Sequence, residues 1–198
     1  MKISRVERRK QDTRQRIAHA ALELFAKQGI DATTIAEISE AADIGKGTFF
    51  TYFPTKEAVL ADIGTLMLAL MSEGVEATEA VGAGPRARLE QLLVPGLEWH
   101  QKHPALSRLS IDVLMRSDSA LDADAANIDA LHGLLVSLVS AGQAKGEFRS
   151  TQPPEAGATA LLGLYFITLH RWHARKAQGS VVEQFKAGLD VLLQGLAT

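Results

Sequence analysis

The chain has 198 residues, 46% of them apolar and 22% charged, which is typical of a globular protein long enough for one or two domains. It contains no cysteine, so disulfides and cysteine-ligated zinc modules are excluded. No apolar run approaches the roughly 18 residues that a membrane helix needs, and the basic N-terminus lacks the hydrophobic segment of a secretion signal. We therefore expect a cytoplasmic protein with no membrane partner.

The charge is unevenly distributed, although the net charge of the chain is only −2. Residues 1–56 carry a net charge of +3, whereas residues 57–198 carry −5. Seven of the first 16 residues are lysine or arginine. A basic head on an acidic body favours a nucleic-acid partner, and the alternative is a solvated, mobile N-terminal tail.

Apolar residues recur at helical spacing along almost the whole chain, and no segment alternates as a strand would. This pattern predicts an all-α fold with nine helices. Glycine, proline and capping residues mark the expected helix ends. The expected helices span residues 13–28, 34–42, 45–53, 56–78, 85–102, 105–116, 119–145, 153–177 and 180–196.

Residues 34–53 have the pattern of a helix-turn-helix, in which two short helices are joined by about four residues. Thr34 and Glu37 are spaced as a capping box, which starts the first of these helices. Asp43 lies in the turn, where a left-handed residue is needed and aspartate tolerates that conformation better than most residues. The second helix would then present its N-terminal end outward, where base edges are recognised.

The second helix of this motif begins with small and cationic residues, which suits close approach to a DNA major groove. Lys46 can reach a guanine or a phosphate, and Thr48 can donate to either kind of acceptor. Thr51 and Tyr52 lie nearer the flanks, where phosphates would pass, and Lys56 adds a cation beside a helix N-terminus. The alternative is a helical hairpin packed inside a core, with the aromatic residues as filler.

The stretch ALELFAKQGIDATTIAEISEAADIGKGTFFTYFPTKEAVL resembles the N-terminal DNA-binding domain of TetR-family transcriptional regulators. The resemblance is close over residues 13–60 and rests on the F-x-x-x-G-x-x-x-T-T run, the G-K-G-T turn, the aromatic cluster and the F-P-T-K-E segment. Over residues 61–198 it is one of architecture only. It implies a helix-turn-helix domain in residues 1–55 that binds a double-stranded DNA operator, and a ligand-binding and dimerisation domain in residues 56–198.

The resemblance further implies a dimeric regulator, usually a repressor, that a small-molecule effector releases from its operator. Many family members carry tyrosine where Phe50 stands and use its hydroxyl to reach a phosphate, which Phe50 cannot do. Thr51 or Tyr52 would then replace this contact. By match of position, the residues implied to contact DNA are Thr34, Lys46, Gly47, Thr48 and Lys56.

A regulator of this kind needs an effector pocket whose filling moves the fourth helix and, with it, the DNA-binding helices. We expect this pocket between the fourth and eighth helices, where aromatic, methionine and leucine side chains favour an apolar or amphipathic molecule. The alternative for each of these residues is a plain core position. The candidate lining residues are Leu66, Leu70, Trp99, His103, Leu109, Met115, Leu135, Tyr165 and Phe166.

Two apolar stripes near the C-terminus repeat every three or four residues, a spacing that suits near-parallel packing in a four-helix bundle. Further apolar residues lie off both stripes, so each helix needs more than one partner. We expect a homodimer interface here, and the alternative is that both stripes face the chain's own core. The expected interface residues are Leu162, Leu169, Trp172, Val182, Phe185, Leu189 and Leu192.

Catalytic motifs are missing from the sequence, so we expect no catalytic residue, no cofactor and no enzymatic activity. Two histidine pairs, His100 with His103 and His170 with His173, have a spacing that can chelate a metal. No carboxylate lies one turn away from both members of either pair, so we expect no metal site. The alternative functions are a helical small-molecule-binding protein that no longer recognises DNA, and an all-helical enzyme that uses the pocket.

Overall fold

The computed structural model describes residues 4–60, 62, 64, 65, 68, 71, 72, 83–115, 122–149 and 151–196. Over these residues the fold is all-α, as predicted, and none of them is in a strand. All described residues between 58 and 72 are helical, and we call them the fourth helix. Together with it, the described residues contain the nine expected helices. The other eight are α1 (Arg5–Gln28), α2 (Ile35–Ala41), α3 (Lys46–Tyr52), α5 (Pro85–Lys102), α6 (Pro104–Met115), α7 (Asp122–Ala144), α8 (Pro154–Ala174) and α9 (Val181–Leu196).

The first helix is longer than expected, because α1 begins at Arg5 rather than near residue 13. Residues 5–12 contain arginine, glutamate, lysine and glutamine, which are good helix formers, and neither glycine nor proline interrupts them. The basic N-terminal segment from Arg5 onward is therefore an ordered extension of α1 and not a mobile tail. At its other end α1 stops before Gly29, whose φ of 82° is left-handed, as the sequence predicts.

The helix-turn-helix is formed by α2 and α3. The capping box at its start is present, since the Thr34 hydroxyl accepts from the Glu37 N–H and the Glu37 carboxylate accepts from the Thr34 N–H. Asp43 has a φ of 51°, which confirms the predicted left-handed residue in the turn. Ile38 and Phe49 are fully buried between the two helices and α1, and this packing fixes the angle at which α3 stands on the protein.

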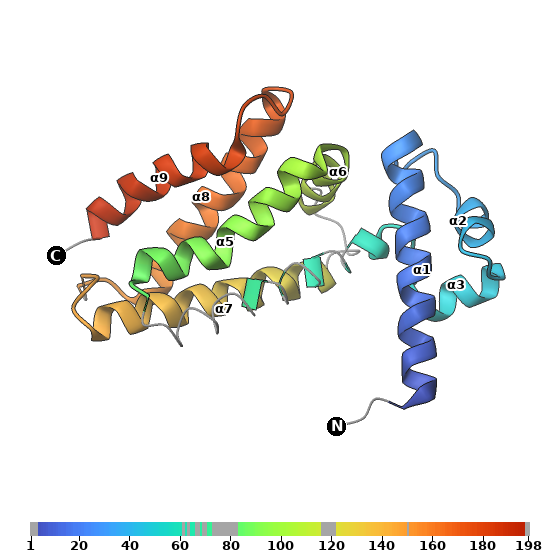
Figure 1. Ribbon diagram of the computed structural model, residues 1–198, viewed down its shortest axis with the longest axis horizontal. Coiled ribbons are helices and arrows are strands. Elements are labelled where there is room, and N and C mark those ends of the chain that lie inside the picture. The colour runs from blue at the N-terminus through green and yellow to red at the C-terminus, as the bar shows by residue number, and fades with distance from the viewer. Residues whose placement is uncertain are drawn as a thin grey trace.

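Two hydrophobic cores divide the molecule. The N-terminal core joins α1, α2, α3 and the first turn of the fourth helix, and Val59 and Leu60 belong to it. The C-terminal core joins α5, α7, α8 and α9, which lie side by side in an elongated bundle with α1–α3 at one end (Figure 1). α6 lies between the two parts and contacts α1, α5 and α8. The N-terminal core thus continues past residue 55, into the fourth helix.

The apolar stripes of α8 and α9 face the chain's own core. Leu169, Trp172, Phe185 and Leu189 are at most 2% exposed, because α5 and α7 of the same chain already fill the seam between α8 and α9. The expectation that these four residues contact a second copy is therefore wrong. The other three predicted interface residues, which are Leu162, Val182 and Leu192, are partly buried and pack against the same core.

Candidate nucleic-acid interface and ligand pocket

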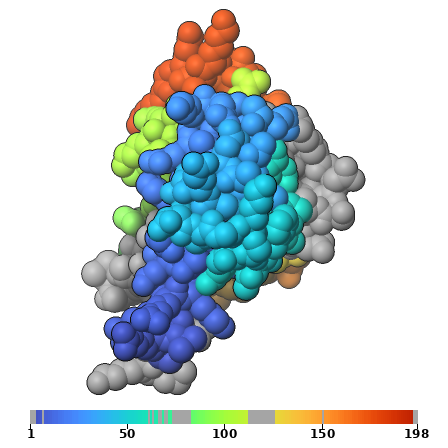
Figure 2. Space-filling view, turned by 90° about the vertical axis from the view of Figure 1, so that its right-hand side faces the viewer, coloured from blue at the N-terminus to red at the C-terminus, as the bar shows by residue number. Residues whose placement is uncertain are grey.

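The N-terminal end of α3 is open to solvent. Lys46, Gly47 and Thr48 are all exposed, and so is Thr51 one turn later. Phe49 points inward, where its ring lies 5.8 Å from that of Phe53 and holds the helix against the N-terminal core. Figure 2 shows this side of the molecule, with α2 and α3 toward the viewer and the first turns of α1, in dark blue, extending beyond them. An exposed helix end with small and cationic residues can enter a major groove.

Thr34 lies at the start of α2, and its side chain belongs to the cap. Its hydroxyl lies 2.8 Å from the Glu37 carboxylate, and its N–H donates to the same carboxylate at 2.7 Å. These hydrogen bonds lower the pKa of Glu37, the one from the Thr34 backbone most strongly, and keep the capping carboxylate charged. Thr34 is exposed, so it can still lie against a DNA backbone while it caps α2.

Lys56 has a structural role that sequence reasoning missed. Its ammonium donates to the carbonyls of Ile30 at 2.5 Å, Thr33 at 2.8 Å and Asp31 at 3.2 Å. An ammonium has three N–H donors, and all three are used here. The expected phosphate contact of Lys56 is thus corrected: the side chain ties the residues before the fourth helix to the loop between α1 and α2.

Arg14 joins α1, the end of α3 and the fourth helix. It makes two hydrogen bonds to the Asp62 carboxylate, at 2.6 and 2.7 Å, and a third to the carbonyl of Tyr52 at 3.1 Å. Its guanidinium also lies 4.4 Å from the centre of the Phe53 ring. The hydrogen bond to Asp62 raises the pKa of Arg14 above its ordinary value. Arg14 therefore links the fourth helix at Asp62 to both α1 and the end of α3.

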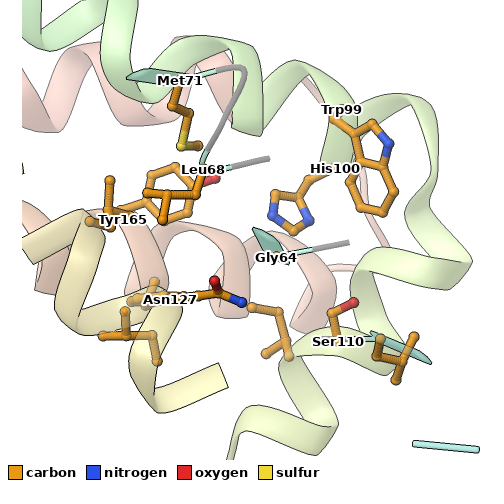
Figure 3. A pocket seen from close by; sticks show the side chains of 13 residues that line it. Gly64, Leu68, Met71, Trp99, His100, Ser110, Asn127 and Tyr165 are labelled. Carbon is orange, nitrogen blue, oxygen red and sulfur yellow. The ribbon is translucent and has the colours of Figure 1, made fainter. Parts of the chain in front are cut away.

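An apolar pocket of about 120 Å³ lies among the fourth helix, α5, α6, α7 and α8. Figure 3 shows Gly64, Leu68 and Met71 on one wall, with the His100 ring projecting from α5 and Tyr165 approaching from α8. No described residue of this lining is a lysine, an arginine, an aspartate or a glutamate. The lining residues are Leu60, Gly64, Leu68, Met71, Trp99, His100, Ser110, Ile111, Asn127, Ile128, Leu131, Tyr165 and Phe166.

The structure brings some of the predicted pocket residues together and places others elsewhere. Trp99, Tyr165 and Phe166 line the pocket, as expected. Leu135 is instead fully buried in the C-terminal core, and Leu109 packs against the N-terminal core.

The other four predicted positions do not line the pocket as described. His103 is an exposed residue that caps the end of α5. Met115 ends α6, with a side chain outside the described part of the chain. Leu66 and Leu70 lie outside the described residues.

The part of the pocket wall that the fourth helix forms could have been predicted from the spacing of its residues. Leu60, Gly64, Leu68 and Met71 follow one another at intervals of four, four and three residues, which is one face of a helix. The sequence interpretation favoured the neighbouring face, because leucine occurs on both faces and periodicity alone does not separate a pocket wall from a core.

A chain of buried polar groups runs from the pocket into α8. The Ser107 hydroxyl lies 2.8 Å from Nδ1 of His100 and 2.6 Å from Nε2 of His173. Burial is the main cause that lowers the pKa of His100 to about 4, and the neighbouring His173 lowers it further. The His100 ring is therefore neutral near pH 7. Thus the histidines that meet come from different predicted pairs. No cluster of three or more metal-ligating side chains occurs among the residues whose side chains are described.

We expect the free energy of unfolding to fall as the pH is lowered from about 6.5 toward 4. Between these pH values His100 binds a proton in the unfolded chain but stays neutral in the folded protein, so protonation favours the unfolded state. The free energy of unfolding then falls by up to about 1.4 kcal/mol per pH unit. Urea unfolding at pH 5 and pH 7 would measure the loss for the wild type and for His100→Asn. The exposed His19→Asn is the matched control, and an equal loss in all three proteins would contradict the prediction.

The fold and the two sites define a class of protein: a helix-turn-helix DNA-binding regulator with an internal ligand pocket. A family described as "Bacterial regulatory proteins, tetR family" matches residues 17–63. The structure of Thermus thermophilus FadR, a TetR-family transcriptional repressor in complex with lauroyl-CoA, is 32% identical. It superposes with a TM-score of 0.78 over 93% of this chain and 95% of that chain.

Two curated relatives agree with this match. The transcriptional repressor KstR2 of Rhodococcus jostii is 27% identical over 96% of this chain and 93% of its own length. The repressor KstR of Mycobacterium tuberculosis is 24% identical over 87% of this chain and 76% of its own length. The chain therefore belongs to the TetR family, and it is a ligand-responsive, DNA-binding transcriptional regulator, as the sequence predicts. No helix in the described residues is long and apolar enough to cross a bilayer.

Proposed function

We propose that this protein is a homodimeric repressor that binds its operator through α3 and leaves it when a fatty acyl thioester fills the pocket. One observation carries the proposal: the pocket and the DNA-binding part share a wall. Leu60 is 3% exposed, belongs to the N-terminal core and also lines the pocket. Trp99 likewise lines the pocket and packs against the N-terminal core.

The pocket is small, and this supports a mechanism in which the effector moves the fourth helix. Its volume of about 120 Å³ is below the range of about 300–1,000 Å³ usual for ligand sites, so a chain-like effector has to widen it. The wall made by Gly64, Leu68 and Met71 is the one connected to the DNA-binding part, through Asp62 and the segment that begins at Lys56. We therefore place the domain boundary within the fourth helix, near residue 60.

The chemistry of the pocket lining favours an apolar chain that ends in a neutral polar group. A buried carboxylate would need a cation or several N–H donors, and the described lining provides no cation. His100, Ser110 and Asn127 provide neutral hydrogen-bonding groups that suit a thioester carbonyl. The relative with 32% identity was crystallised with lauroyl-CoA, which agrees with this class of effector. In this proposal the protein is a regulator and not an enzyme.

The dimer interface is proposed on the outer face of the α8–α9 pair. A side chain at Gly188 would contact Leu164, so these two positions mark where α8 and α9 meet. Ile167 and Val191 follow them by three residues each and are 52% and 72% exposed. Small exposed residues surround them on the same face, namely Ala160, Gly163 and Ala187. A second copy related by a two-fold axis would bury this apolar face.

The test is fluorescence anisotropy of the purified protein on labelled DNA from upstream of its own coding sequence. We expect tight binding relative to a scrambled duplex, a steep loss of affinity with salt, and release by lauroyl-CoA. Equal, weak binding to both duplexes, with no sequence enriched from a random DNA pool, would favour the alternative of a helical ligand-binding protein that no longer recognises DNA.

A further inference from the structure

The Tyr165 hydroxyl is a buried polar group that the described part of the chain leaves unpaired. Tyr165 is 3% exposed and lines the apolar pocket. No other described residue forms a hydrogen bond with its hydroxyl. Buried hydroxyl groups in proteins usually have a hydrogen-bond partner, because an unpaired one is costly to bury. Burial also raises the pKa of Tyr165, so the hydroxyl keeps its proton and can donate a hydrogen bond.

The packing around Tyr165 holds its hydroxyl at the wall of the pocket. The ring packs edge-on against Phe166 and Phe185, with centre-to-centre distances of 5.5 and 6.1 Å. A Cβ placed on Gly96 would lie only 2.5 Å from the hydroxyl oxygen, so α5 approaches this oxygen closely. Figure 3 shows the hydroxyl pointing into the pocket on the side of the His100 ring. Because the ring is fixed by these contacts, its hydroxyl stays directed at whatever occupies the pocket.

His100 provides a second polar group to the same space. Its Nδ1 lies 2.8 Å from the Ser107 hydroxyl, which leaves Nε2 for a partner in the pocket. The pKa of about 4 keeps the ring neutral near pH 7, so the ring carries a single N–H. The Ser107 hydroxyl has one proton to share between His100 and His173, whose Nε2 lies 2.6 Å away. When Ser107 donates to His100, the ring proton is on Nε2, which then donates into the pocket.

These two groups suit a single hydrogen-bond acceptor on a ligand. The ring centres of His100 and Tyr165 are 6.3 Å apart, which is close enough for both donors to reach one oxygen. A carbonyl oxygen has two lone pairs and accepts two hydrogen bonds, whereas a hydrocarbon chain of the same length accepts none. Most of the described lining is apolar, so a ligand without an acceptor at this place would leave both groups unpaired.

We propose that Tyr165 determines the specificity of the pocket: its hydroxyl and Nε2 of His100 donate to the carbonyl oxygen of the effector's thioester. This inference rests on the proposed function, because it assigns the residues that recognise the polar end of the same acyl chain. The carbonyl oxygen, and not the chain alone, is then the feature that the protein selects. Ser107 is a positioning residue, which donates to Nδ1 of His100 and accepts from His173.

The experiment compares two probes that differ only at the carbonyl group. Lauroyl-CoA contains it, and S-dodecyl-CoA is the thioether with a methylene group in its place. Titration calorimetry on the full chain measures the binding of both. We expect the wild type to bind lauroyl-CoA about tenfold more tightly or more, since the thioether leaves two buried donors unpaired. Tyr165→Phe removes only the hydroxyl and should lose most of this preference, through weaker binding of lauroyl-CoA and little change for S-dodecyl-CoA.

The matched control is Thr168→Val, about one turn further along α8. Thr168 is 8% exposed, its hydroxyl donates to the Leu164 carbonyl at 2.6 Å, and it does not line the pocket. This variant should keep the wild-type preference. Infrared spectra of lauroyl-CoA that is isotope-labelled at the carbonyl carbon give an independent readout. The carbonyl band should shift to lower frequency on binding to the wild type and less on binding to Tyr165→Phe, whereas loosened packing alone would weaken both probes alike.

The outcomes separate this inference from the proposed function. If the wild type binds both probes equally, or if Tyr165→Phe keeps the full preference, the role of Tyr165 is overturned while the acyl effector stands. If neither probe binds the wild type, the effector class is overturned and the role of Tyr165 with it. DNA binding is measured separately by anisotropy and does not depend on either result. A circular dichroism melt of each variant confirms that it is folded.

Discussion

Replacing Lys46 and Thr48 together by alanine is expected to weaken operator binding by about two orders of magnitude or more. Both side chains are exposed at the open end of α3, where a groove-entering helix makes its base contacts, and each good base contact contributes about 1–3 kcal/mol of discrimination. The N-cap of α3 is Gly45, which has no side-chain cap bond, so the substitutions leave the helix start intact. Anisotropy on operator and scrambled duplexes at several salt concentrations measures the loss.

The pattern of loss distinguishes recognition from simple charge attraction. The variant should bind the two duplexes almost equally, and its affinity should depend less on salt because one cation is gone. Lys27→Ala is the matched control: it removes one exposed cation from the last turn of α1 and should leave operator preference unchanged. If the double variant distinguishes the duplexes as well as the wild type, α3 is not the recognition helix.

The DNA-binding part was the more predictable half of the molecule, because local signals specify it. A capping box and a turn aspartate are readable over the short span from Thr34 to Asp43, and each has its expected geometry. The links that connect this part to the pocket were not predictable. Arg14 and Asp62 lie 48 positions apart, and the bonds of Lys56 run to carbonyls, which no side-chain pattern reveals.

The C-terminal half shows why apolar stripes are ambiguous. The spacing of Leu169, Trp172 and Phe185 predicted two helix faces that need partners, and this was correct. It did not say which partners, because a helix of the same chain and a helix of a second copy satisfy the same periodicity. The decisive information is the packing of α5 and α7 against the stripes, which depends on the whole fold. The face that we propose for a second copy is the weaker, exposed stripe around Ile167 and Val191.

Replacing Ile167 and Val191 together by glutamate is expected to convert the protein to a monomer and to lower operator affinity by about a hundredfold or more. Two charges on the proposed apolar face would have to be buried against like charges of the second copy, which is strongly unfavourable. Each monomer would then bind its half of the operator separately. The gain in affinity that comes from linking two binding units, about 10²–10⁴, would be lost. Light scattering on a sizing column and anisotropy on the operator measure the two effects.

The matched control for the dimer test is Ala126→Glu/Ala130→Glu, which adds the same charges at exposed positions of α7 and should remain dimeric. Phe185→Ala gives a different response, because this side chain is fully buried in the chain's own core. Its truncation is expected to lower the free energy of unfolding by about 3–5 kcal/mol and not to disrupt an interface. A monomer that keeps its melting temperature therefore identifies the outer face as the interface. An unchanged dimer peak for Ile167→Glu/Val191→Glu would place the interface on another surface, and a monomer with full operator affinity would show that the protein does not bind DNA as a pair.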